Sequence, residues 1–422
     1  MMIFGKSKLE KKLDIWITKG GDLYEALRSE INQPVSSRED AKAICRALDV
    51  VREKGNSEAT FASTLRHLTV FFQLADDPKA MEVFGTEGLP RLRVWVHDLL
   101  AGKDVDEDAV MFILKILGMY RQREDLELIA RVARLPAVSD RFMWSMILSQ
   151  FDTDHPYSNG MIDLLRDPLL GGFVLVSYLD MANALAIAGK LDRHPFDSDE
   201  GCKQLERFLS DQNEDNFSYA ISATAAIPFI SPSKYRERLL SAALGHADSL
   251  VRIEAAWAQA KSGDDDGFRR LVQLCLDPRF SHTAQIYLNE LGRTELIPEN
   301  AREEEFRAVA EMANWLAHPS ELGRPPDSVE LFDARELFWP PTSDRRRLFL
   351  VKYSAGEEVG VGMVGSVTFA LFGEATADMS PEEIYSVHCC WELEMNGDSR
   401  APAERTTAAG REILAKYNSG FR

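Results

Sequence analysis

The three glycines of residues 360–365 form the motif whose chemistry would be the most specific in this sequence. Gly360, Gly362 and Gly365 match the spacing G-x-G-x-x-G, in which glycines let backbone N–H groups approach a phosphate. A dinucleotide-binding motif of this kind must open a helix, but the following residues, SVTFALF, predict a strand. A kinase-type loop would need a lysine on the next strand and a long catalytic lobe, and only residues 366–422 remain. We therefore interpret the glycines as points of close strand contact and predict no nucleotide or other cofactor.

His388, Cys389 and Cys390 place two reactive types of side chain next to each other. A reactive thiolate needs an open, electropositive site, and a zinc site needs separated pairs of ligands. Neighbouring residues on a helix point about 100° apart, so they chelate one metal ion poorly. Cysteine is also among the most buried residue types. We predict that this cluster belongs to a core, and a catalytic thiol is the alternative.

Carboxylates also gather in the C-terminal part of the chain, at Glu374, Asp378, Glu392 and Glu394. Such groups serve as an acid and a base when burial separates their pKa values. In a chain with 67 acidic residues, a solvated surface is the simpler interpretation. The run Asp264–Asp266 lacks the alternating ligands and the closing glutamate of a calcium loop, so it predicts a turn and a helix cap. The sequence predicts no metal site and identifies no catalytic residue.

The elements that would position any site are mainly helices, and residues 235–291 show them most clearly. Apolar residues recur there at i, i+3, i+4 and i+7, which predicts two consecutive helical hairpins. The four stripes contain Tyr235, Leu239, Ala243 and Leu244; Val251, Ala255 and Ala258; Phe268, Leu271, Val272 and Cys275; and Ala284, Tyr287, Leu288 and Leu291. A helix pair of this kind cannot bury both apolar faces alone and has to stack on neighbours.

The stretch DSLVRIEAAWA, from Asp248 to Ala258, resembles the second helix of a HEAT-type repeat. Such repeats carry an aspartate, then a Val-Arg pair, here Val251 and Arg252, and then closely spaced alanines. The resemblance is clearest over residues 235–291. It implies an α-solenoid, and HEAT-like proteins are mostly scaffolds and adaptors, although some are chromophore lyases or DNA-repair enzymes. Members that bind DNA rely on basic surfaces, and this acidic chain departs from them.

Three regions follow from these patterns. Residues 1–318 predict an all-α helical repeat domain, irregular at its N-terminal end and HEAT-like at 200–295. Residues 319–344 contain Pro-Pro breaks and predict a linker that packs against the protein. Residues 345–422 predict a small α+β domain with strands in RRLFLVKYS and around the glycines, a helix that starts after Ser380, and a last helix. The fold class expected is mainly α, an α-solenoid of HEAT-like helix pairs followed by this α+β domain.

Charge and composition exclude several classes of function. The formal charge is −18, and the regions on either side of His318 are both acidic, which argues against nucleic acid as the main partner. Arg345–Arg347 is the only run of three basic residues, and we interpret it as the solvated start of a strand. No apolar run is long enough to cross a membrane, and the N-terminus lacks the features of a secretory signal. With five cysteines and no CxxC pair, we expect reduced thiols and a cytoplasmic location.

Together these observations predict a protein-interaction scaffold or adaptor that presents a concave helical-repeat surface to a protein partner. A few aromatic or arginine anchors would supply most of the affinity. The alternative is an enzyme or a small-ligand-binding protein whose site lies between the α+β domain and the last helices. A cleft at that junction lined by a perturbed carboxylate or by His388 would favour the alternative. No oligomeric state is predicted.

Overall fold

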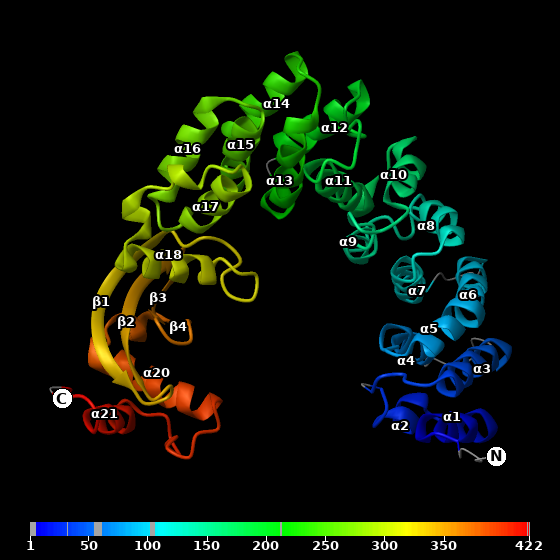
Figure 1. Cartoon of the computed structure of the whole chain (residues 1–422), viewed down its shortest axis with the longest axis horizontal. Coiled ribbons are helices and arrows are strands. Elements are labelled where there is room, and N and C mark those ends of the chain that lie inside the picture. Colours follow the sequence, from blue (N-terminus) through cyan, green and yellow to red (C-terminus); the bar gives the residue numbers. More distant parts are fainter. Residues whose placement is uncertain are drawn as a thin grey trace. The chain divides into compact units, whose positions relative to one another are not determined.

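A computed structural model describes residues 6–31, 33–54, 61–101, 106–211, 213–419 and 421 of the chain. The protein is mainly helical, and one antiparallel sheet with further helices follows near the C-terminus (Figure 1). The chain divides into two compact units, Met1–Arg236 and Glu237–Arg422. This division differs from the boundary expected at 318, since the helices after Arg236 and the sheet belong to the same unit.

The described part of the first unit is almost entirely helical. Its α-helices are α1 (Lys8–Lys19), α2 (Leu23–Leu27), α3 (Arg38–Lys54), α4 (Phe61–Gln73), α5 (Pro78–Val83), α6 (Leu89–Ala101), α7 (Glu107–Met119), α8 (Leu126–Val132), α9 (Met143–Leu148), α10 (Ser158–Arg166), α11 (Gly172–Ile187), α12 (Asp199–Ser210) and α13 (Phe217–Ala226). Many begin at a side-chain cap. Asp77 caps α5 with Pro78 at the first helical position, as an Asp-Pro pair predicts, and Ser198 caps α12.

The later helices of this unit pack in two layers. Helix α7 packs on α9, α9 on α11, and α11 on α13, so these four form one continuous layer. Helix α8 packs on α10 in the other layer, and the pairs α6/α7, α10/α11 and α12/α13 connect the two layers (Figure 1). Stacking of this kind buries the apolar face that each pair cannot bury alone.

The second unit opens with a group of helices. They are the rest of α14 (Lys234–Leu244), α15 (Ser249–Lys261), α16 (Asp265–Cys275), α17 (Ser281–Glu290) and α18 (Glu304–Leu316). The four helices expected in residues 235–291 are present as α14–α17, with Asp248 as the cap of α15 and both Ala255 and Ala258 fully buried. Helix α16 approaches α15 closely at Gly267, where a Cβ atom would lie 2.2 Å from the backbone nitrogen of Ala260.

A four-stranded sheet completes the described part of the second unit. Its strands are β1 (Ser328–Trp339), β2 (Asp344–Ala355), β3 (Glu358–Val364) and β4 (Phe369–Phe372), which are antiparallel in the order β1-β2-β3-β4. Helices α19 (Glu374–Ala377), α20 (Pro381–Met395) and α21 (Thr407–Ala415) follow. The predicted helix start at Ser380 is confirmed, because its side chain forms a capping box with Glu383.

Both faces of the sheet are covered. Phe349 and Val351 of β2 pack against Val309 and Met312 of α18 on one face. The alternate residues of β2, Leu348 and Leu350, pack with α20 and α21 on the other face. Side chains alternate between the faces of a strand, so a strand buried on both sides has a continuous apolar run such as Leu348–Val351.

Strand β1 corrects one expectation. Residues 328–339 lie within the segment expected to be a linker, but they pair with β2 along their length. The register shifts between Leu331 and Asp333, so Leu331 faces α18 whereas Leu337 and Trp339 face α20. This irregularity interrupts the alternating pattern by which strands are found in sequences, and the prolines on either side suggested an irregular segment.

The free edge of β1 is closed near its end by one amide side chain. Phe338 donates its backbone N–H to Oδ1 of Asn418 at 2.8 Å, and Nδ2 of Asn418 donates to the carbonyl oxygen of Phe338 at 3.0 Å. The rings of Phe338 and Tyr417 stack beside this pair. The side chain of Asn418 thus replaces a neighbouring strand at this residue.

Candidate functional site

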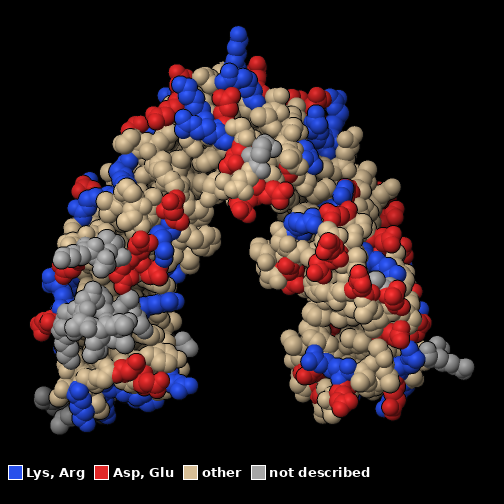
Figure 2. Space-filling view, turned by 180° about the vertical axis from the view of Figure 1, so that it is seen from behind, with Lys and Arg blue, Asp and Glu red and all other residues tan. Residues whose placement is uncertain are grey.

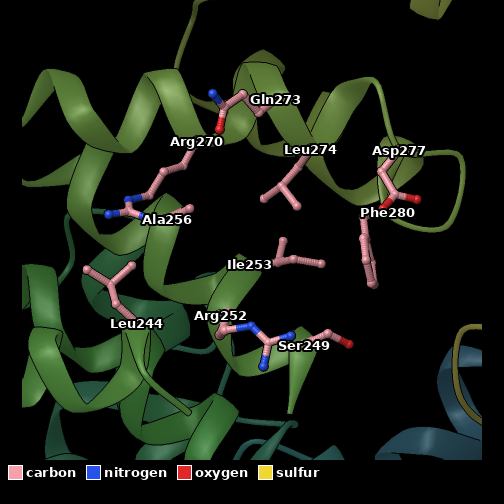
Figure 3. A pocket seen from close by; sticks show the side chains of 10 residues that line it. All are labelled: Leu244, Ser249, Arg252, Ile253, Ala256, Arg270, Gln273, Leu274, Asp277 and Phe280. Atoms are coloured by element: carbon pink, nitrogen blue, oxygen red, sulfur yellow. The ribbon is translucent and has the colours of Figure 1, made fainter. Parts of the chain in front are cut away.

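A groove on helices α14–α16 of the second unit combines an apolar floor with charged walls. It holds about 280 Å³ and opens to solvent. The side chains that line it are Leu244, Ser249, Arg252, Ile253, Ala256, Arg270, Gln273, Leu274, Asp277 and Phe280 (Figure 3). Ile253 of α15 and Leu274 of α16 point toward each other across the groove, and Phe280 lies at one end. The volume suits one or two side chains rather than a nucleotide.

The turn between α14 and α15 shapes one wall of the groove. Asp248 accepts hydrogen bonds from the backbone N–H groups of Leu250 and Val251, at 2.8 and 3.1 Å, and thereby caps α15. Arg252 donates through Nη1 to the carbonyl oxygens of His246 and Ala247, at 2.7 and 2.6 Å. The aspartate and the arginine of the HEAT-like pattern therefore fix the turn, and the arginine keeps further N–H groups for other contacts.

The opposite end of the groove is built by the turn after α16. The carboxylate of Asp277 accepts from Nε and Nη2 of Arg279, at 3.0 and 2.7 Å, and from the backbone N–H of Arg279 at 3.1 Å. Burial acts to raise the pKa of Asp277, but the hydrogen bonds from Arg279 hold it below its ordinary value. The guanidinium of Arg279 also lies 5.0 Å from the ring centre of Phe280. Asp277 is therefore an ionised carboxylate whose negative charge is balanced by the guanidinium of Arg279.

The groove has an excess of positive charge. Arg270 is exposed on α16 and makes no hydrogen bond or ion pair with the residues that the structure describes. Arg252 is also exposed, and its partners are neutral carbonyl groups. The groove therefore carries a local positive charge in a chain whose formal charge is −18.

A buried acid lies on α15 directly after Ile253. Glu254 is 8% exposed, and its carboxylate accepts a hydrogen bond from the hydroxyl of Tyr287 on α17. Burial raises the pKa of Glu254 to about 7, against the lowering effect of the Tyr287 hydrogen bond and with a further rise from Glu290. Trp257 lies one turn further along α15, and its ring centre is 5.8 Å from that of Tyr287.

The glycine motif lies in the sheet. Gly360 and Gly362 belong to β3, and Gly365 follows it, so the predicted strand context is confirmed. A Cβ atom at Gly360 would lie 2.1 Å from the carbonyl oxygen of Leu371, and one at Gly362 would lie 2.2 Å from Cε of Met312. Gly365 has a φ angle of +107°, which favours glycine. Close packing and backbone conformation thus account for all three glycines, and the absence of nucleotide binding stays a prediction.

The cluster on α20 is buried, as expected. His388, Cys389 and Cys390 are at most 1% exposed, and all five cysteines of the chain are free thiols. Burial lowers the pKa of His388 to about 3, so its imidazole is neutral, and Nε2 of this ring has no hydrogen-bond partner. Burial raises the pKa of the Cys390 thiol, which opposes formation of a thiolate.

The C-terminal carboxylates separate into two kinds. Glu374, Asp378 and Glu394 are exposed as expected, but the expectation is wrong for Glu392, which is 2% exposed. Glu392 accepts hydrogen bonds from Nε1 of Trp339 at 2.8 Å and from Oγ of Ser366 at 2.7 Å. It connects α20 to the sheet. Glu392 lies at helical spacing from the buried residue Cys389 of α20. A sequence rich in glutamates nevertheless gives no sign of which glutamate is buried.

The two remaining charged runs have structural roles. Asp264 caps α16 by accepting from the backbone N–H of Asp266 at 2.9 Å, as predicted for this acidic run. The run Arg345–Arg347 lies at the start of β2, also as predicted. Arg347 forms ion pairs with Glu304 and Glu305 of α18, at 3.0 and 2.6 Å.

A hollow of about 410 Å³ lies where the last helix of the all-α region meets the sheet. It is lined by Glu311, Asn314, Trp315, His318, Ser320 and Thr368. Thr368 donates to Glu311 at 2.7 Å, and the ring of Trp315 meets Phe369 edge to face. Under the alternative function, a cleft was expected at this junction, and this hollow lies there. His388, which was named as a possible lining residue, is not among the residues that line it.

The described part of the chain contains neither a cluster of metal ligands nor a membrane-spanning helix. Its histidine, cysteine and acidic side chains nowhere form a group of three or more that could hold a metal ion. No helix in the same part has both the length and the apolarity needed to cross a bilayer. Figure 2 shows acidic and basic side chains interspersed over both units, without a continuous basic stripe on the face in view.

Comparison with known proteins identifies no family: no family model, curated protein or solved structure matches this chain.

Most of the groove was not found as a site from the sequence. Arg252 belongs to the HEAT-like pattern and Leu244 to an apolar stripe, but Arg270, Gln273 and Phe280 carry no motif. The available signal was the position of Arg270 and Gln273, three residues apart and therefore on the same side of an amphipathic helix.

Proposed function

We propose that this chain is a protein-binding scaffold, an α-solenoid of HEAT-like helix pairs that presents a helical-repeat surface to a protein partner. The groove on α14–α16 carries the proposal. Ile253 and Leu274 line it without closing it, and an open apolar site beside arginines has the composition of an interface anchor. The five free, buried thiols favour a reducing compartment, and we propose the cytoplasm.

A partly exposed row of aromatic residues in the first unit supports the same function. Phe142 precedes α9 and is 71% exposed, and its ring lies 5.5 Å from that of Phe173 on α11. The ring centres of Phe173 and Tyr219, on α13, are 6.3 Å apart. Those of Tyr219 and Phe208, on α12, are 5.7 Å apart. Phe173, Phe208 and Tyr219 are half-buried, so the row offers a partner a large, rigid and partly exposed aromatic area centred on Phe142.

The function is tested by blocking the groove with an indole. Gln273 is exposed on the groove wall, so Gln273→Trp fills the groove without disturbing the core. His282→Trp introduces the same side chain at an exposed position of α17 and is the matched control. Each full-length protein is immobilised and exposed to a lysate of the cells that produce it, and the retained proteins are quantified by mass spectrometry.

We expect at least one protein that wild type and His282→Trp retain and Gln273→Trp loses, while the melting temperatures of all three agree. If the same proteins are retained by all three, the groove is not the binding surface and the proposal fails.

A small-ligand-binding protein is the second candidate, because a hollow exists at the junction of α18 and the sheet. Its lining combines a carboxylate, an imidazole and an indole, those of Glu311, His318 and Trp315. A screen of metabolites by thermal shift tests this function, since a ligand that binds only the folded state raises the melting temperature. A rise that Glu311→Gln and His318→Ala abolish would support it. Equal rises in the variants, or none in wild type, would contradict it.

A further inference from the structure

We propose that the groove recognises a partner segment in which a carboxylate side chain lies close to a bulky apolar side chain. This inference rests on the proposed scaffold function and defines the chemistry of the partner. The apolar side chain would enter between Ile253 and Leu274, and the carboxylate would reach Arg270 at the rim.

The charge of the groove selects an acidic segment. Arg270 is exposed and has no polar partner among the described residues, and Arg252 donates only to neutral carbonyl oxygens. Of the lining residues, only Asp277 carries a carboxylate, and Arg279 neutralises it with two side-chain hydrogen bonds. A guanidinium group offers a fork of N–H donors that matches the two oxygens of a carboxylate.

The apolar floor selects the second feature. Ile253 is 2% exposed and Ala256 is 1% exposed, so they form a fixed surface, whereas Leu274 is half-buried and keeps apolar area to offer. A polar group placed against this floor would lose its hydration without gaining a hydrogen bond. A segment with charge alone would leave the floor in water, so the two features are required together.

A peptide is the occupant that these observations favour over a nucleic acid. The formal charge of −18 repels a polyanion along most of the chain, and the positive charge of the groove is confined to two arginines on its walls. One or two carboxylates on a short segment match this local charge.

Selection from a phage-displayed library of random peptides, on the full-length protein, provides the probe. The best-enriched peptide is then synthesised with a fluorophore, and its dissociation constant is measured by anisotropy against wild type and variants. Arg270→Gln removes the charge, Arg270→Glu reverses it, and Leu274→Ser removes apolar area. Arg345→Glu makes the same charge change at an exposed position outside the groove and is the control.

The enriched peptides should carry Asp or Glu within a few residues of Leu, Phe, Ile or Trp. Arg270→Gln should weaken binding about fivefold, as for a solvent-accessible ion pair, and Arg270→Glu by more than about tenfold. Leu274→Ser should weaken binding by a factor similar to that of Arg270→Gln. Arg345→Glu should bind the peptide like wild type. Binding should also weaken as salt is added.

The results that would contradict this inference are of two kinds. Peptides that Gln273→Trp excludes but that lack carboxylates, or that bind Arg270→Glu as tightly as wild type, would leave the scaffold function standing and overturn this inference. If no peptide sensitive to Gln273→Trp is enriched, or if a single-stranded oligonucleotide competes for the groove at lower concentration than the peptide, the acidic-segment proposal is wrong.

Discussion

The indole nitrogen of Trp339 donates a hydrogen bond of 2.8 Å to the carboxylate of Glu392, and both side chains are almost fully buried. Trp339 ends the edge strand β1 and Glu392 lies on α20, so the bond connects two elements that are far apart in the sequence. Ser366, which follows β3, donates to the other carboxylate oxygen. A buried carboxyl group that loses one of its two donors keeps an unpaired oxygen, which costs free energy.

Removal of the indole donor should therefore destabilise the second unit. Trp339→Phe keeps a ring but leaves one oxygen of Glu392 without its donor, and we expect a loss of about 2–4 kcal/mol in the free energy of unfolding. Glu394→Gln is the control, since Glu394 is exposed and paired with Arg405 at the surface, and should cost less than about 1 kcal/mol. Urea denaturation of both variants checks the difference, and equal losses would contradict the role given to the bond.

Glu254 should make the stability of the second unit depend on pH. Its pKa in the folded chain is raised to about 7, so folding favours the protonated acid. This stabilisation is complete below the ordinary pKa of about 4.5 and is lost as pH rises through 7. Relative to Glu254→Gln, wild type should therefore lose on the order of 3 kcal/mol between those limits.

Hydrogen exchange measured by mass spectrometry, on peptides from α15 and α17, localises this effect. Protection there should fall with pH in wild type and stay flatter in Glu254→Gln, after correction for the intrinsic exchange rate. A constant difference between the two proteins would show that Glu254 does not titrate in this range.

The close approach of α16 to α15 should make Gly267 intolerant of a side chain. A Cβ atom there would lie 2.2 Å from the backbone nitrogen of Ala260 and 2.8 Å from the carbonyl oxygen of Ala256, and backbone atoms cannot yield as a flexible side chain does. We expect Gly267→Ala to cost about 2–4 kcal/mol. At Gly245 the nearest atom is 3.4 Å away, so Gly245→Ala should cost less than about 1 kcal/mol. Thermal denaturation compares the two, and similar melting temperatures would contradict the packing argument.

The glycines of β3 should bind no nucleotide. Their Cα atoms face Leu371 and Met312 at distances that leave no room even for a methyl group. Saturating ATP, GTP or NAD should therefore leave the melting temperature unchanged, since a ligand specific for the folded state would raise it. A reproducible rise of several degrees would revive the phosphate-binding interpretation.

Removal of the sheet should damage the helices before it. Helix α18 packs Ala308, Val309, Met312 and Leu316 against β2 and β3, and truncation after Pro319 would expose all four to water. The truncated chain should aggregate or melt at a lower temperature, and residues 340–422 alone, which lack β1, should fold poorly. Light scattering and circular dichroism check both fragments. Two fragments that each melt like the intact protein would show independent domains.

The helices were predictable from the sequence where capping and periodicity agreed. Asp248, Asp264 and Ser380 mark helix starts by a local hydrogen bond that a sequence pattern can reveal. Strand β1 was missed because its register shift reverses the face of every later residue, which local alternation does not encode. The burial of Glu392 depends on Trp339, which lies 53 residues away in the chain.

The candidate groove was less predictable than the fold. Ile253 and Leu274 were visible as apolar residues, but their orientation across an open gap depends on how α15 and α16 are spaced by Gly267. Arg270 is one of many arginines, and it becomes notable only because it forms no hydrogen bond or ion pair with the described residues. A missing partner is a property of three-dimensional arrangement, and sequence patterns record only what is present.

The amide of Asn418 has a consequence for how copies of the chain behave at high concentration. A strand edge with free N–H and C=O groups is a template for open-ended polymerisation, in which each copy adds its own edge to the last. Asn418 occupies both groups of Phe338, so an incoming strand would find the ladder blocked at the aromatic end of β1, where its apolar side chains would gain most from pairing. We therefore expect the side chain of Asn418 to hinder edge-to-edge pairing of β1 between copies of the chain.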